Sequence, residues 1–175
     1  MTASPAPGDS GAVAASSVSR EADAEHSPTP FDHAERRIWS GKAEAYARTY
    51  ARLCAHPAAG LLDAAGAGPG SRVLDVGCGS GTIDFLAAGR GATVHAVDAE
   101  PGMVDATRRA VPEAEARTAR PPELPYADDA FDAVVGNFVL NHVGRGLLAL
   151  PHAALPARGT CRRCSTYRRR PRPWR

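Results

Sequence analysis

The sequence lacks features that several classes of protein require. No apolar run approaches the roughly 20 residues of a membrane-spanning helix, and the chain does not open with a charged segment and a long apolar one, as a secretory signal would. Four cysteines in 175 residues are too few and too unevenly spaced for a disulfide scaffold, which agrees with a reducing compartment. We therefore expect a cytoplasmic protein without a membrane partner.

Lysine is nearly absent, and acidic residues are missing from the end of the chain. Lys42 is the only lysine, so a phosphate-binding P-loop is excluded, because that loop needs a lysine directly after its glycines. No acidic residue follows Asp132, and residues 158–175 contain eight arginines. We expect 158–175 to be a disordered Arg-rich tail and nucleic acid to bind only through it, by releasing counterions.

The other end of the chain has few large apolar residues. Residues 1–30 are rich in Ala, Ser, Pro and Gly, so they bury too little apolar surface to offset the entropy of ordering. We predict a disordered leader over 1–30 and a single folded domain over 31–157. The pair Cys161 and Cys164 has no second pair of ligands, so no metal site is expected.

The most informative stretch is residues 72–81, Arg-Val-Leu-Asp-Val-Gly-Cys-Gly-Ser-Gly. A short β-branched run leads into three alternate glycines, and residues 82–88 follow with helical apolar spacing, which predicts a strand, a tight turn and a helix. Because Gly77, Gly79 and Gly81 lack Cβ atoms, a ligand can approach the backbone N–H groups that open the helix. The glycines alone do not identify that ligand.

Asp75 favours a cationic ligand over a pyrophosphate. A carboxylate two residues before the first glycine would repel the pyrophosphate of a dinucleotide, and Thr82 stands where the dinucleotide motif needs its last glycine. S-adenosylmethionine (SAM) instead brings a sulfonium and an ammonium group, which suit an acidic strand end. An NAD(P)-binding oxidoreductase remains the alternative.

Two further strands are predicted to end beside this turn. Residues 92–97 are predominantly apolar and predict a strand, closed by Asp98. Asp98 lies 21 residues beyond Gly77, where an acid can accept hydrogen bonds from a ribose diol. Residues 131–139 are predicted as the fourth strand, with Asn137 at its carboxyl end, placed for the methionine end of SAM. His142 is a candidate general base, although an ordinary loop histidine explains it as well.

Residues 73–81, 94–98 and 131–135 together resemble the class I SAM-dependent methyltransferases, in the branch that acts mostly on small molecules. The resemblance covers about residues 36–143. It implies an α/β Rossmann-like fold with a mostly parallel sheet, SAM as cofactor, a small-molecule methyl acceptor and no metal.

The resemblance also implies roles for residues outside the glycine turn. The periodic apolar residues between Ile38 and Cys54 predict a helix, and a second is predicted at 58–65; in the family such helices form a lid over cofactor and substrate. Trp39 and Tyr46 are then candidates for contacting the sulfonium, or else ordinary packing aromatics. Met103 is placed against the adenine, and Ala99 lies beside the cofactor.

The chain departs from the family pattern in two places. Arg120 stands where relatives carry an acid that binds the adenine amino group, and after Val143 the resemblance is lost. We expect a methyltransferase truncated by a shifted reading frame, with a fold incomplete at its C-terminal half and impaired turnover. The fourth strand would then be a sheet edge open to self-association. A non-catalytic remnant that binds SAM weakly is a further alternative.

Overall fold

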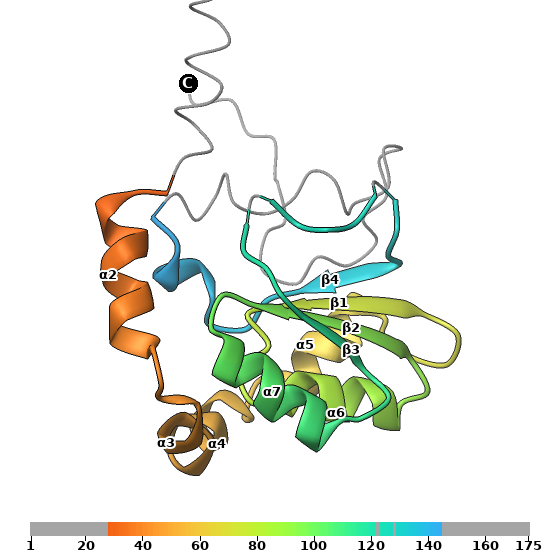
Figure 1. Ribbon diagram of the computed structural model, residues 1–175. Helices are drawn as coiled ribbons and strands as arrows, with labels where there is room; N and C mark the ends of the chain where they lie inside the picture. Colours follow the sequence, from red (N-terminus) through yellow and green to blue (C-terminus); the bar gives the residue numbers. More distant parts are fainter. Residues whose placement is uncertain (1–27, 122, 128, 145–175) are drawn as a thin grey trace, which may run out of the picture.

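The computed structural model describes residues 28–121, 123–127 and 129–144, and a four-stranded parallel sheet lies at its centre (Figure 1). The strands are β1 (Arg72–Val76), β2 (Thr93–Asp98), β3 (Glu115–Thr118) and β4 (Ala133–Val135), in the order β3-β2-β1-β4. Parallel strands place their carboxyl ends at one edge of the sheet, which is where such sheets bind ligands. The predicted Rossmann-like α/β class is confirmed.

Three helices cover one face of the sheet: α5 (Ala58–Ala65), α6 (Thr82–Gly89) and α7 (Pro101–Ala110) (Figure 1). Leu62 of α5 and Ile83 of α6 pack with Val73 of β1 in one core cluster. Val73 to Val76 are all buried, as expected for a strand covered on both faces. Leu74, Val76 and Phe131 form a second cluster on the opposite face. The predictions for 72–76, 82–88 and 58–65 are therefore confirmed to within one residue.

The prediction of one helix between Ile38 and Cys54 is wrong, because this part of the chain forms three short helices. They are α2 (Pro30–Trp39), α3 (Ala43–Arg48) and α4 (Tyr50–Cys54). Gly41 breaks the first from the second with a φ of +69°, and Thr49 breaks the second from the third with φ −124° and ψ −84°. Helical spacing of apolar residues persists across such breaks, so it conceals them.

Helix α2 begins inside the segment predicted to be a disordered leader. Thr29 caps it: the Asp32 N–H donates to the Thr29 hydroxyl oxygen (3.2 Å), and the Thr29 N–H donates to the Asp32 carboxylate (2.7 Å). Pro30 occupies the first helical position, where its missing N–H costs no hydrogen bond. Residues 28–30 therefore belong to the folded part, whereas residues 1–27 lie outside the described residues.

Strand β4 is shorter than the predicted 131–139. It ends at Val135, and Phe138 has a φ of +58°, a left-handed conformation that no strand can accommodate. A 3₁₀ turn, η1 (Leu140–His142), follows. In the described part of the chain β4 pairs only with β1. Its predicted edge position and self-association through it stay predictions, because residues 145–175 lie outside the described residues.

Some expectations fall on residues that the structure does not describe. The Arg-rich tail at 158–175 and the pair Cys161 and Cys164 lie outside the described residues. Within the described ranges, no helix has the length and apolar character needed to cross a membrane.

Candidate functional site

A cavity of about 1230 Å³ opens at the carboxyl edge of the sheet. On one side lies the cradle, by which we mean residues 75–81 and 98–103; on the other lies the lid, which is helices α2, α3 and α4. The cavity lining includes most of the predicted site residues: Trp39, Tyr46, Gly77, Gly79, Asp98, Ala99, Met103, Asn137 and His142. Asp75 and Gly81 do not line it.

The backbone of the glycine turn is held against β2 and closely covered from above. The N–H groups of Gly77 and Cys78 both donate to the Val97 carbonyl, at 2.8 and 3.0 Å. A Cβ on Gly77 would stand 2.7 Å from a Val139 methyl carbon, and one on Gly79 would stand 2.9 Å from the Tyr46 ring. Both residues also have positive φ. Only glycine therefore fits at these two positions, where a side chain would be strained and would press on Val139 or Tyr46.

Gly81 has a different role, since it ends the turn and caps α6 with a φ of +86°. A Cβ there would stand 3.2 Å from the Thr107 Cα atom of α7. The buried Thr107 hydroxyl donates to the Gly79 carbonyl at 3.1 Å. Gly81 thus allows α6 and α7 to pack together, which fixes the turn in place.

Asp98 ties the turn to the start of α7. One carboxylate oxygen accepts the Gly79 N–H at 3.0 Å, and the other accepts the Glu100 N–H at 2.9 Å. Burial raises the pKa of Asp98, and the Glu100 and Gly79 hydrogen bonds oppose that rise. A carboxylate has about four acceptor positions, so Asp98 keeps acceptor capacity toward the cavity that it lines.

Asp75 lies beneath the turn, where it forms a buried pair with Asp84 of α6. The exposed fractions of the two residues are 1% and 0%, and none of their four carboxyl oxygens has a hydrogen-bond donor as partner among the described residues. Burial, followed by the neighbouring Asp84, raises the pKa of Asp75 well above its usual range, and burial raises the pKa of Asp84 to about 7. A proton retained by the pair follows from these shifts. Sequence reasoning missed Asp84, because an acid in a first helical turn usually faces solvent.

Aromatic side chains gather on the lid side of the cavity. The Trp39 ring meets Tyr46 edge to face at 5.8 Å between centroids, and Tyr50 likewise at 6.4 Å. Burial, and then hydrogen bonding to Cys54, raises the pKa of Tyr46 above its ordinary value, so this phenol stays neutral. Trp39 and Tyr46 therefore serve as packing partners of one another as well as cavity walls.

The segment after β4 is joined to the lid. The Asn137 amide donates to the Cys54 carbonyl at the end of α4 (2.8 Å), so its N–H₂ group holds the lid. His142 lies 2.7 Å from Glu35 and 5.3 Å, between ring centroids, from Trp39. Sequence reasoning missed Glu35, because α2 went unpredicted; the Thr29 and Asp32 capping pattern was the signal that marks its start.

The outer part of the cavity is apolar and open to solvent. Four of its lining residues expose much of their surface: Ile38 (49%), Tyr50 (60%), Leu53 (63%) and Phe138 (55%). Arg120 also lines the cavity. Among the described residues, no group of three or more His, Cys, Asp or Glu side chains is placed to hold a metal ion.

Sequence comparison identifies a known domain family. The family model described as a methyltransferase domain matches residues 73–154. A demethylmenaquinone methyltransferase of Renibacterium salmoninarum is 40% identical over 90 residues, which is 51% of this chain and 38% of that protein. An uncharacterised protein of Mycobacterium tuberculosis is 44% identical over 79 residues, which is 43% of this chain and 29% of that protein. The matches thus span well under half of these relatives.

Solved structures share the fold at low sequence identity. A SAM-dependent methyltransferase from Aquifex aeolicus superimposes with a TM-score of 0.50 at 18% identity, covering 70% of this chain and 66% of that one. A geranyl diphosphate C-methyltransferase from Streptomyces coelicolor, solved with S-adenosyl-L-homocysteine, gives 0.50 at 20% identity, covering 63% and 55%. These likenesses agree with the sheet described above.

Proposed function

Because this chain belongs to the class I SAM-dependent methyltransferase family, we propose that it transfers the methyl group of SAM to a small-molecule acceptor. The cavity between cradle and lid is the site of this transfer. The observation that carries the proposal is that two glycines without room for a Cβ, Gly77 and Gly79, line the same cavity as Asp98, whose carboxylate accepts the Gly79 N–H.

The residues of the cradle fit the cofactor of this family, S-adenosylmethionine. Gly77 and Gly79 line the part of the cavity that would receive the nucleoside and methionine portions, and Asp98 has acceptor capacity for the ribose diol. Met103, which is 4% exposed, offers an apolar wall to the adenine. Trp39 and Tyr46 line the cavity, where the face of either ring would attract a sulfonium.

The bound cofactor supplies an activated methyl group, and the contribution of this chain is mainly to position the acceptor. Asp98 and the Gly79 N–H fix the turn, so the cofactor side of the cavity is rigid. The lid forms the opposite wall of the cavity, through Trp39 and Tyr46. Holding two reactants in line supplies a large share of the rate acceleration in such displacements.

The acceptor is proposed to have an apolar portion. Ile38, Leu53 and Phe138 line the outer cavity, and each exposes about half or more of its surface. Burying these side chains against an apolar ligand is favourable by about 25 cal/mol per Å². The Renibacterium relative is named a demethylmenaquinone methyltransferase, so demethylmenaquinone belongs among the acceptors to be tested.

The test is transfer of a radiolabelled methyl group from SAM to a panel of phenols, amines, carboxylates and demethylmenaquinone. We expect transfer to an acceptor with an apolar portion, below the range of about 1 to 1000 per second that is usual for enzymes. Poor turnover is expected because Arg120 replaces an adenine acceptor. Saturable SAM binding without transfer to any acceptor would instead favour a non-catalytic SAM-binding protein.

A further inference from the structure

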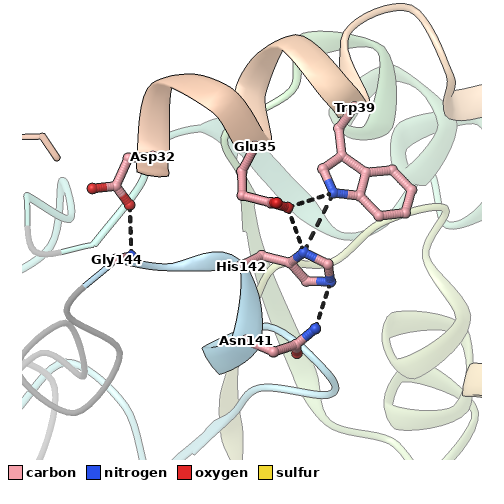
Figure 2. A network of polar contacts seen from close by, with 6 residues as sticks. All are labelled: Asp32, Glu35, Trp39, Asn141, His142 and Gly144. Atoms are coloured by element: carbon pink, nitrogen blue, oxygen red, sulfur yellow. Dashed lines mark hydrogen bonds and ion pairs between the residues drawn. The ribbon is translucent and has the colours of Figure 1, made fainter. Parts of the chain in front are cut away.

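Helix α2 meets the segment after β4 through a network of polar contacts at the cavity wall (Figure 2). The Glu35 carboxylate lies 2.7 Å from the Nδ1 atom of His142, and the Trp39 indole N–H donates to the same carboxylate oxygen at 3.2 Å. The Asn141 amide nitrogen lies 2.9 Å from the Nε2 atom of His142. A second contact, from the Gly144 N–H to Asp32 at 2.8 Å, joins the same two segments.

These contacts are mutually consistent for only one neutral form of His142. Glu35 is an acceptor when ionised, so the Nδ1 atom that faces it must carry the proton. The Asn141 amide nitrogen is a donor, so the Nε2 atom that faces it must hold the lone pair. The 3.4 Å approach of the Trp39 nitrogen to Nδ1 is then a contact between two donors, and the indole proton goes to Glu35 instead.

The network stands where an acceptor would bind. Glu35, Trp39, Asn141 and His142 all line the cavity. The Glu35 side chain is 17% exposed and that of His142 is 35% exposed, so the carboxylate is shielded while the imidazole is reachable. Asn141 is an exposed residue, so an acceptor hydroxyl or amine can take the place of its amide at Nε2.

Helix α2 depends on this network for its position. None of its residues is buried, so it has no apolar anchor in the core. Its links to the segment after β4 are the ring contact of Trp39 with His142 and two polar contacts, Glu35 with His142 and Asp32 with Gly144, which span 107 and 112 positions of sequence. The contact between Glu35 and His142 therefore exists only while α2 lies against the segment after β4.

We propose that Glu35 is a positioning residue for His142: it holds the imidazole in the Nδ1–H form and leaves Nε2 to take the acceptor proton. This inference rests on the proposed methyl transfer. The acceptor lone pair forms a bond to the methyl carbon, the carbon–sulfur bond breaks with its electrons going to sulfur, and the acceptor proton moves to Nε2. The resulting imidazolium is stabilised by the Glu35 carboxylate, as in other carboxylate and histidine pairs.

The test measures the imidazole directly by ¹⁵N NMR on the full chain, at a pH where His142 is neutral. We expect a pyrrole-type signal for Nδ1 and a pyridine-type signal for Nε2 in the wild type. In Glu35→Gln, whose amide can donate as well as accept, the two signals should move toward one another as the second tautomer appears. Glu44→Gln is the matched control, because Glu44 is an exposed lid carboxylate paired only with Arg48 among the described residues.

Kinetics supply the second readout. Glu35→Gln should lower kcat by up to about 100-fold, the lower end of the roughly 10²- to 10⁴-fold that acid–base catalysis contributes, because the imidazole itself remains; the KM for SAM should be unchanged. An Nε2–H form in the wild type, or unchanged kcat in Glu35→Gln, would overturn the inference. The NMR result needs no turnover, so a chain that fails to methylate any acceptor but shows the Nδ1–H form would contradict the proposed function and not the pairing.

Discussion

The cradle and the lid hold their parts together in different ways. In the cradle, backbone hydrogen bonds hold the glycine turn against the neighbouring strand, such as those from the N–H groups of Gly77 and Cys78 to the Val97 carbonyl. The core beneath the turn is almost fully buried. In the lid, α2 buries none of its residues and is held by side chains that reach more than 100 positions along the chain. The cofactor side of the site is therefore held by the backbone of the sheet, whereas the acceptor side is held by a few side-chain contacts that single substitutions can remove.

The largest predicted effect concerns Asp75 and Asp84, the two buried acids beneath the glycine turn of the cradle. Burial raises the pKa of Asp84 to about 7, so the folded state holds its proton more tightly than the unfolded state, whose pKa is 3.8. The stabilising contribution is therefore complete below about pH 4 and is lost as the pH rises through about 7. Asp84→Asn should remove the Asp84 part of this dependence, leaving the part that comes from the raised pKa of Asp75, and raise the free energy of unfolding at pH 8 by roughly 2 to 4 kcal/mol.

Denaturant unfolding across this pH range is the measurement. Glu44→Gln on the lid serves as the control, because its carboxylate is exposed and should leave the pH dependence as in the wild type. If Asp84→Asn kept the full wild-type slope between pH 4 and 7, Asp84 would not have a raised pKa in the folded state. The cradle and the lid would then not differ in how their acidic residues affect the pH dependence of stability.

The next effect concerns the open backbone of the cradle. Gly79→Ala should weaken S-adenosyl-L-homocysteine binding roughly 10- to 100-fold, because alanine at a φ of +58° costs about 1 to 2 kcal/mol and its Cβ would press on Tyr46. Gly60→Ala is the control: it lies in α5, no atom lies within 4 Å of its added Cβ, and its φ is ordinary. Calorimetric affinities within twofold of each other for the two variants would refute the role given to Gly79.

The smallest effect belongs to the apolar outer cavity. Phe138→Ser should raise the KM for an apolar acceptor about three- to tenfold, which is the usual effect of losing part of one hydrophobic contact. Affinity for S-adenosyl-L-homocysteine should not change. Phe85→Ser is a matched control, because Phe85 is similarly exposed (64% against 55%) but lies on α6 and does not line the cavity. Equal KM values for the two variants would show that Phe138 does not touch the acceptor.

The same contrast explains what the sequence could predict. The strand, turn and helix of the cradle follow from a local pattern of apolar residues and glycines, so β1 and α6 were predicted to within a residue. Asp98 was placed at the cavity because the distance from Gly77 to the next strand end is set by the parallel crossover. Local sequence patterns were therefore enough to predict the cofactor side of the site.

The lid could not be predicted in the same way. The breaks at Gly41 and Thr49 lie within continuous helical spacing, and β4 stops early because of a backbone turn at Phe138. The contact between Glu35 and His142 joins residues 107 positions apart, and no local signal reports such a separation. Asp84 was missed because its burial beside Asp75 arises from tertiary packing, which the local sequence does not show.

The central claim is that the cradle binds a SAM-type cofactor, and calorimetric titration with SAM, S-adenosyl-L-homocysteine and NAD tests it most directly. We predict saturable binding of the first two and none of NAD. Asp98→Ala should weaken SAM binding by about 1 to 3 kcal/mol, as expected when hydrogen bonds to a charged group are lost. Saturable binding of NAD with no binding of SAM would contradict the account.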